Sequence, residues 1–251
     1  MISLRHVYKS FGSKRVLQDF SLDVEEGETV ALIGFSGTGK SVAIKHIVGL
    51  LMPDSGQVLV DGLNVPDLTR QELYRLRARI GYVFQFAALF DSMTIGDNVA
   101  MGLRKQEGLD EGEIAARVKE ALQLVDLPDA VDRFPAELSG GMRKRVGIAR
   151  AIALRPKYIL YDEPTTGLDP VTSAVIDDLM LRMERQLGVT GVVITHDMRS
   201  AYTVSNRIAM LYEGRVRQVG TVDEIKETTD PVVRQFIEGR AELAASTGIA
   251  G

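Results

Sequence analysis

The chain has 251 residues, a formal net charge of −4 and no cysteine, and 45% of its residues are apolar. This composition is typical of a soluble globular protein, and the length predicts one or two domains. It excludes disulfide frameworks, thiolate nucleophiles and Cys-ligated metals, while the slightly acidic balance argues against a nucleic-acid partner. No apolar stretch approaches the roughly 18 residues of a membrane span, and the N-terminal segment interleaves basic and apolar residues, unlike a signal peptide. We therefore expect a cytoplasmic setting.

The first third of the chain predicts strands around one helix. Apolar residues alternate over residues 1–33, which indicates short half-buried strands joined by turns. Val30–Ile33 is an unbroken apolar run, typical of a strand covered on both faces. A helical pattern runs from Ser41 to about Leu51, and residues 57–63 and 79–84 indicate further strands.

The segment between the buried strand and the first helix fits the phosphate-loop pattern G-x-x-x-x-G-K-[ST]. Its residues are Gly34, Phe35, Ser36, Gly37, Thr38, Gly39, Lys40 and Ser41. Glycines let backbone N–H groups surround phosphate oxygens, and the positive end of the helix points at the same anion. Lys40 would contact the β- and γ-phosphates, and the Ser41 hydroxyl would ligate Mg²⁺. A chance glycine-rich turn is the alternative, but its place between strand and helix favours a nucleoside triphosphate site.

Between about residues 86 and 155 the pattern becomes mostly helical. One helix carries apolar residues on a single face, at Ile114, Val118, Ala121, Leu122 and Val125. A second helix is predicted from about Ser139 to Leu154, with Ser139 as N-cap and Gly140 and Gly141 exposing the first backbone N–H groups to an anion. One nucleotide does not need two such helix ends from one chain. We therefore expect the second end to bind a nucleotide held by a neighbouring copy.

Strand patterns return in the last third, and two of these strands end in polar side chains. Residues 158–161 form an apolar run followed by Asp162 and Glu163. In an open parallel sheet, ligands lie at the carboxyl ends of the strands, so this pair would face the phosphates. Asp162 would hold Mg²⁺ and Glu163 would activate a water, although two such acids can also be a solvated turn. His196 follows another strand, where a neutral imidazole could bond the γ-phosphate; a lone histidine is otherwise a packed polar residue.

Taken together, these motifs resemble those of the ATPase subunits of ABC transporters. They are the phosphate loop, Gln85 after a strand, LSGGM at 138–142, YILYDEP at 158–164, GLDP at 167–170 and His196. The resemblance covers about residues 2–220, and it is specific because six motifs occur in the family's order and spacing. It implies an α/β P-loop ATPase fold with a RecA-like core, an antiparallel β subdomain and an inserted helical subdomain.

The resemblance also implies the organisation of the chain. Residues 1–240 would form a single ATPase domain, with the core at about 1–85 and 156–220 and the helical subdomain at about 86–155. A C-terminal helix and a loose tail would follow over residues 221–251. The helix, near residues 231–237, could pack on its own domain or on a partner copy.

Roles follow from the resemblance, position by position. Phe11 matches the aromatic residue that stacks on adenine, and Gln85 matches the glutamine that contacts Mg²⁺ or water and reports the nucleotide state to the membrane subunit. Ser139, Gly140 and Gly141 match the signature that binds ATP across a homodimer, and Asp169 matches the residue that couples the two sites. Glu163, His196 and Gln85 form the implied catalytic set. Met142 replaces the commoner glutamine, which puts a side-chain contact to the nucleotide in doubt. His6 and His46 lack such a setting and are interpreted as structural, so the scattered histidines argue against zinc.

A finer resemblance points to the ATPases of Mla/MCE-type lipid transporters. It rests on the Met-Arg-Lys-Arg that follows LSGG and on Ala-Leu-Phe-Asp-Ser at 88–92. It implies phospholipid transport between inner and outer membrane, with permease subunits and an MCE-domain protein, at the cytoplasmic face of the inner membrane. The main alternative is an importer of amino acids or other small solutes. A soluble ABC protein or a P-loop kinase fits less well, because the chain has one motif set, no heptad run and the LSGGM segment.

Residues 86–90 form an apolar cluster directly after Gln85. Part of the cluster is expected to belong to the core of the helical insert. The other interpretation is a groove wall that receives a helix of the membrane subunit, which requires exposed apolar side chains. Both interpretations stay open.

Overall fold

The structure, a computed structural model, describes residues 1–106 and 108–240, and its larger sheet has six strands. They are β3 (Thr29–Ile33), β6 (Ile80–Val83), β7 (Tyr158–Asp162), β8 (Thr190–Ile194), β9 (Arg207–Tyr212) and β10 (Arg215–Thr221). Their order is β10-β9-β3-β8-β7-β6, and all are parallel except β10, which pairs antiparallel with β9. β3, β7 and β8 are buried at every position, as their apolar runs predicted. The carboxyl ends of the parallel strands therefore meet at one edge.

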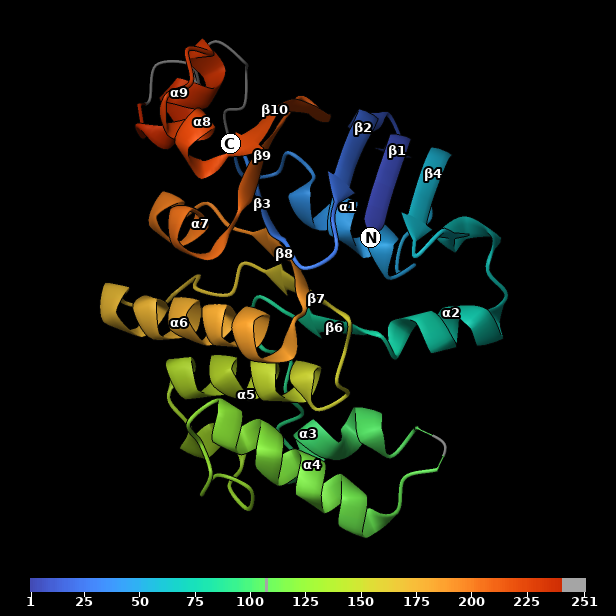
Figure 1. Cartoon of the computed structure of the whole chain (residues 1–251), viewed down its shortest axis with the longest axis vertical. Helices are drawn as coiled ribbons and strands as arrows, with labels where there is room; N and C mark the ends of the chain where they lie inside the picture. The colour runs from blue at the N-terminus through green and yellow to red at the C-terminus, as the bar shows by residue number, and fades with distance from the viewer. Residues whose placement is uncertain (107, 241–251) are drawn as a thin grey trace.

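The smaller sheet is antiparallel and stands beside the larger one (Figure 1). Its strands are β1 (Ile2–Phe11), β2 (Lys14–Val24), β4 (Ser55–Val60) and β5 (Leu63–Asn64), in the order β2-β1-β4-β5. β1 and β2 have 10 and 11 residues, so the N-terminal strands are longer than predicted. Shifts of register interrupt the pairing of β1 with β2, and such bulges break the alternation that marks a long strand in sequence.

The helix after the phosphate loop, α1, runs from Lys40 to Ile47 and so ends before the predicted Leu51. Gly49 follows it with a φ of +63°, a left-handed conformation that ends a helix. Arg77, the last residue of α2 (Arg70–Arg77), donates from Nε and an Nη atom to two backbone carbonyls at that end, at 2.8 and 2.9 Å. The guanidinium thereby satisfies carbonyls that a helix end leaves without an intrahelical donor.

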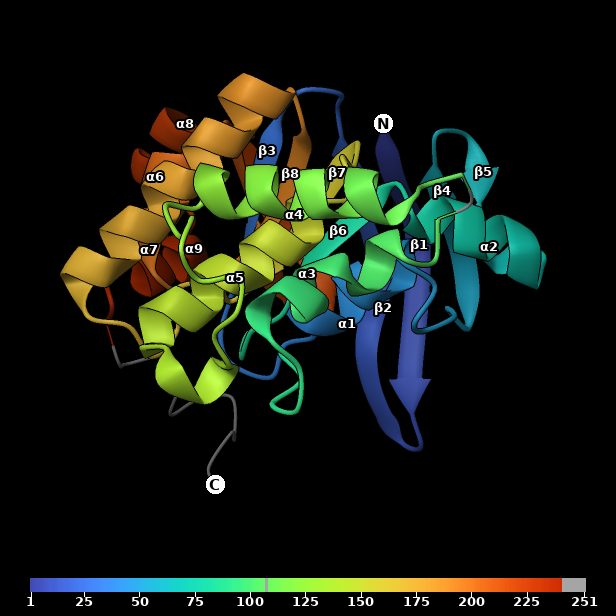
Figure 2. The same cartoon turned by 90° about the horizontal axis from the view of Figure 1, so that it is seen from below.

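The chain between β6 and β7 forms a layer of helices against the end of the larger sheet (Figures 1 and 2). It contains α3 (Ile95–Leu103), α4 (Glu111–Leu124), the short 3-10 helix η2 (Pro135–Glu137) and α5 (Gly140–Ile152). The predicted apolar face of α4 is buried, from Ile114 to Val125, in one cluster with α3, α5 and α6 (Pro170–Leu187). The predicted helical insert in an α/β core is confirmed.

The last two helices, α8 (Val222–Lys226) and α9 (Pro231–Ile237), lie at the end of the molecule opposite the helical layer, whereas α7 (Met198–Val204) lies beside α6 (Figure 1). The 3-10 helix η1 (Val65–Asp67) follows β5. Val233 of α9 is buried in a cluster with residues of β3 and β9, so this helix packs on its own chain. The predicted loose tail lies outside the described residues. Within residues 1–106 and 108–240, no helix combines the length and the apolar character that crossing a membrane requires.

Candidate nucleotide site

The phosphate loop joins β3 to α1 at the carboxyl edge of the larger sheet. Gly34 starts it with a backbone so close to β9 that an added Cβ would lie 2.4 Å from the Leu211 carbonyl oxygen. The Lys40 ammonium donates to the carbonyls of Gly34 and Phe35 at 2.7 and 3.0 Å. Burial lowers the pKa of Lys40, and the nearby carboxylates of the site oppose that shift. The loop thus surrounds a buried cation, while Ser36 and Gly37 are exposed at its crest.

Asp162 and the loop serine meet although 121 positions separate them in the chain. The Ser41 hydroxyl donates to Asp162 Oδ1 at 2.8 Å, and the Tyr82 hydroxyl donates to Asp162 Oδ2 at 3.0 Å. Burial and the charge of Asp162 raise the pKa of Tyr82, which therefore remains a donor. Tyr82 was missed in the sequence because it lies on β6, and only the pairing of β6 with β7 brings it to the site.

Glu163 follows β7 in a left-handed conformation, with a φ of +54° that is rare for residues other than glycine. Its Oε2 atom accepts from the Thr166 hydroxyl at 2.6 Å and lies 2.6 Å from Nδ1 of His196. The Glu163 side chain is 14% exposed and that of His196 58%, so the pair is open to water on the histidine side. Thr166 was also missed, although a hydroxyl three residues after an acid is a local hydrogen-bonding pattern.

Two hard oxygen donors, the Ser41 hydroxyl and the Asp162 carboxylate, are thus adjacent at the mouth of the phosphate loop. Mg²⁺ prefers one or two such protein ligands and takes the rest of its shell from phosphates and water. The residues present fit that ion. The described ranges contain no group of three or more His, Cys, Asp or Glu side chains that could bind a metal without a nucleotide.

The signature end of α5 lies apart from these groups. Ser139 caps the helix by accepting from the Met142 backbone N–H at 3.3 Å, and Ser139 and Gly140 are exposed. In the described parts of the chain, no hydrogen bond or ion pair joins residues 139–141 to the phosphate loop. The Met142 side chain packs against the apolar cluster of the helical layer.

The other predicted site residues occupy separate positions. Phe11 is 47% exposed at the end of β1, with the Lys9 ammonium 5.6 Å from its ring centroid. Asp169 caps α6 and accepts from two backbone N–H groups at 2.9 and 3.0 Å. The backbone carbonyl of Gln85 accepts from the Lys144 ammonium of α5. His46 is buried with Nδ1 2.6 Å from a backbone carbonyl, and His6 contacts Asp19 on the surface.

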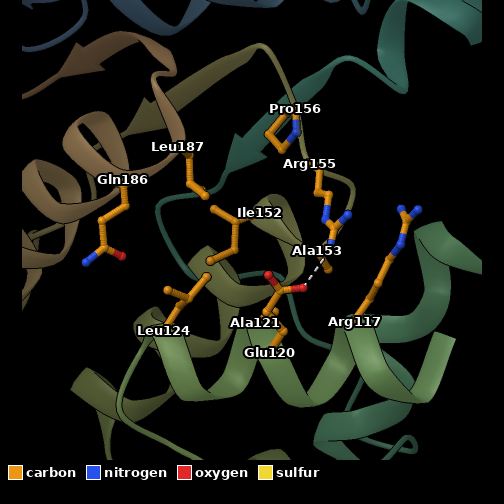
Figure 3. Close-up of a pocket in the computed structure, with 10 residues that line it drawn as sticks. All are labelled: Arg117, Glu120, Ala121, Leu124, Ile152, Ala153, Arg155, Pro156, Gln186 and Leu187. Carbon is orange, nitrogen blue, oxygen red and sulfur yellow. Dashed lines mark hydrogen bonds and ion pairs between the residues drawn. The ribbon is translucent and has the colours of Figure 1, made fainter. Parts of the chain in front are cut away.

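A hollow of about 280 Å³ lies elsewhere, between α4, the end of α5 and the end of α6 (Figure 3). Its floor includes Leu124, Ile152 and Leu187, and the Arg155–Glu120 ion pair at 2.9 Å lies at its rim. None of the predicted site residues lines it.

Comparisons with known proteins agree with this geometry. The sequence model of the ABC transporter family matches residues 17–166. A solved dimeric ATP-binding cassette in a post-hydrolysis state, bound to ADP and Pi, superposes with a TM-score of 0.81 at 35% identity, covering 88% of this chain and 99% of that chain.

Curated relatives carry different transport names. The probable ribonucleotide transport ATP-binding protein mkl of Mycobacterium leprae is 43% identical over 239 residues, 95% of this chain and 69% of that protein. The methionine import ATP-binding protein MetN of Carboxydothermus hydrogenoformans is 41% identical over 241 residues, 94% of this chain and 71% of that protein. The intermembrane phospholipid transport ATP-binding protein MlaF of Escherichia coli K12 is 37% identical over 242 residues, 96% of this chain and 90% of that protein. The chain thus belongs to the ABC transporter family, as an ATP-binding and ATP-hydrolysing subunit.

Proposed function

We propose that this chain powers phospholipid transport between the inner and outer membranes. It works as a peripheral homodimer at the cytoplasmic face of the inner membrane. Its partners are transmembrane permease subunits and an MCE-domain lipid-binding protein, and it binds ATP with Mg²⁺.

The observation that carries this proposal is the similarity to the phospholipid transport ATPase of E. coli, which spans most of both chains. Two local features support it, the Met-Arg-Lys-Arg after LSGG and the Ala-Leu-Phe-Asp-Ser stretch at 88–92. The similarity to a methionine import ATPase supports a second candidate, an importer of amino acids or other small solutes. Cargo is selected by other subunits in both cases, so the nucleotide site does not discriminate between them.

The contacts at the sheet edge support one role for each residue of the chain's own site. The phosphate loop, including Gly34, Ser36, Gly37, Thr38, Gly39, Lys40 and Ser41, holds the phosphates, and Phe11 stacks on the base. Ser41 and Asp162, which contact each other, would hold Mg²⁺ together with Gln85, and the ion would neutralise charge on the phosphates. Glu163 accepts a proton from the attacking water. His196 contacts the Oε2 atom of Glu163 and keeps that carboxylate oriented.

The exposed signature supports a site completed by a second copy. Ser139 and Gly140 are exposed at a helix N-terminus and Gly141 is buried directly behind them, and such a helix end binds anions. In the dimer this end closes over the γ-phosphate held by the partner, and Asp169 at the start of α6 lies between the two sites. ATP drives closure because it binds the closed dimer more tightly than the open one. Hydrolysis removes that difference and the dimer opens.

The apolar cluster after Gln85 supports a contact with the permease. Phe86 and Phe90 are 81% and 50% exposed, whereas Ala87 is buried and Leu89 packs against the helical layer. The cluster is thus divided between core and surface. The two exposed rings are the anchors on which a short cytoplasmic helix of the permease docks.

Co-purification tests the proposal. The tagged chain is extracted from native membranes in mild detergent, and proteins and lipids that accompany it are identified by mass spectrometry. A permease together with an MCE-domain protein and bound phospholipid is the expected result. A permease with a solute receptor would keep the ATPase and contradict lipid transport, and the absence of any membrane protein would contradict the transporter assignment.

A further inference from the structure

Lys144 is a buried cation on the helix that begins with the signature, and it contacts the nucleotide site of the same chain. It lies on α5, five residues after the N-cap Ser139, and is only 7% exposed. A rise of about 1.5 Å per residue puts it roughly two turns of helix or less from the signature end. Its ammonium contacts the chain's own site.

The Lys144 ammonium donates to two backbone carbonyls there. One is the carbonyl of Gln85, where the chain leaves β6 and enters the helical insert. The other is the carbonyl of Glu163, at 3.3 Å, where the chain leaves β7. One group thus joins α5 to the two loops that carry Gln85 and the proposed general base Glu163.

The surroundings make this contact stronger than a surface hydrogen bond. Burial lowers the pKa of Lys144, while the negative charge of Glu163 opposes that shift. A charged donor in a poorly solvated position bonds neutral carbonyls strongly, and its loss leaves two partly buried acceptors without this partner.

A second cation on α5, Arg150, adds contacts between this helix and the segment that follows Gln85. Arg150 donates to the carbonyls of Ala87 and Ala88 at 2.5 and 2.6 Å. Both alanines have positive φ, so the segment after Gln85 is held in a rare conformation by α5. The helix that presents the signature therefore also holds the segment after Gln85 in place.

We propose that Lys144 is a positioning residue that couples the two ATP sites of the homodimer, because it ties the signature helix, which serves the partner's nucleotide, to Gln85 and Glu163, which serve the chain's own. The proposal rests on the proposed ATP-bridged homodimer. Movement of α5 on binding the partner's nucleotide shifts the backbone at Gln85 and Glu163, and movement of those loops shifts the signature. Such coupling is reciprocal.

The test uses full-length dimers with two different affinity tags, so that each copy can be altered separately. The reference dimer carries Glu163→Gln in one copy, which leaves a single active site. Lys144→Met, which keeps the aliphatic stem but removes the charge, is then added either to the copy whose Glu163 is intact or to the copy that carries Glu163→Gln. In the second arrangement the active site has a normal Glu163 and borrows only its signature from the altered copy. Single-turnover hydrolysis of ATP is measured in each.

Coupling predicts a loss of roughly tenfold or more in both arrangements, which is the change in rate that the loss of one hydrogen bond to a charged group typically causes. A loss only when Lys144→Met lies in the copy with intact Glu163 would show a purely local role and overturn the proposal, as would no loss in either. Lys144→Arg, which keeps the charge, is expected to restore most of the rate. Melting temperatures of all variants are compared, and Lys144→Gln replaces Lys144→Met if the latter does not fold. A wild-type dimer without ATPase activity in the same assay would overturn the proposed function, a result that the Lys144 variants by themselves cannot give.

Discussion

The residues predicted to bind and hydrolyse ATP form two halves, one at the edge of the larger sheet and one at the start of α5. The two halves differ in how far a single chain brings their residues together. At the edge of the larger sheet, Ser41 contacts Asp162 and Glu163 contacts His196, both at hydrogen-bond distances. At the start of α5, the signature is capped, Ser139 and Gly140 are exposed, and no hydrogen bond joins residues 139–141 to that edge in the described residues. The first half is positioned by the core of a single chain. The second half would be completed by the second copy of the proposed homodimer.

The largest effect that tests this difference is expected at Glu163. Glu163→Gln should lower turnover by roughly 10²–10⁴, the usual contribution of a positioned general base, while nucleotide binding persists. ATPase rates and fluorescent-nucleotide affinity measure the two properties separately. Glu28→Gln is a matched control, because Glu28 pairs with Arg207 beside the amino end of β3, and its turnover should stay normal. Near-normal hydrolysis in Glu163→Gln would show that the assembled half lacks the assigned base.

The next largest effect is expected at the signature, at the start of α5. Gly140→Asp places a negative charge where the partner's γ-phosphate would bind, and should lower hydrolysis by about 10²–10³. The fold tolerates this change, because a Cβ at Gly140 would meet only Leu168 Cδ2, at 3.9 Å, and an acid suits a helix N-terminus. Light scattering with ATP should show that dimerisation is lost while the melting temperature is kept. Gly140→Ala, which adds only a methyl group, should be affected less, and full activity in Gly140→Asp would contradict a site shared between copies.

A smaller effect is expected at Tyr82, which belongs to the assembled half. Tyr82→Phe removes one hydrogen bond to Asp162 and should raise the Mg²⁺ concentration required about two- to tenfold, because a single bond contributes about 0.5–1.5 kcal/mol. Mg²⁺ titrations of both ATPase rate and nucleotide affinity measure the change. Tyr74→Phe is the control, since that hydroxyl donates to a backbone carbonyl at the surface. Equal Mg²⁺ curves for Tyr82→Phe and wild type would remove Tyr82 from the site.

The smallest effect compares two helix caps of similar geometry. Ser139 and Thr69 each accept from the backbone N–H three residues on, at 3.3 Å. Replacing either by alanine should cost about 1 kcal/mol of unfolding free energy, measured in urea. Only Ser139→Ala should also lower ATPase activity, since Thr69 caps α2, which carries none of the predicted site residues. If both variants kept full activity, Ser139 would be a cap and nothing more.

Local patterns in the sequence were sufficient for much of this protein. The buried strands, the apolar face of α4 and the N-cap of α5 were all predicted, because each depends on residues within a few positions of one another. The same holds for the phosphate loop, whose glycines, lysine and serine are contiguous. Bulges interrupt the alternating pattern of β1, so the strand was predicted to be shorter than it is. The helix α1 was predicted to be longer than it is, because it ends near Gly49, before the expected stop signal.

Contacts between distant segments could not be obtained in this way. The hydroxyl of Tyr82 reaches Asp162 because β6 and β7 are neighbours, and Lys144 reaches Gln85 and Glu163 because α5 packs across the ends of both strands. Neither residue has a distinctive sequence pattern, since a tyrosine in a strand and a lysine in a helix are ordinary. Their roles arise from burial and from which backbone atoms lie within reach, and both are set by how the sheet and the helical layer pack together.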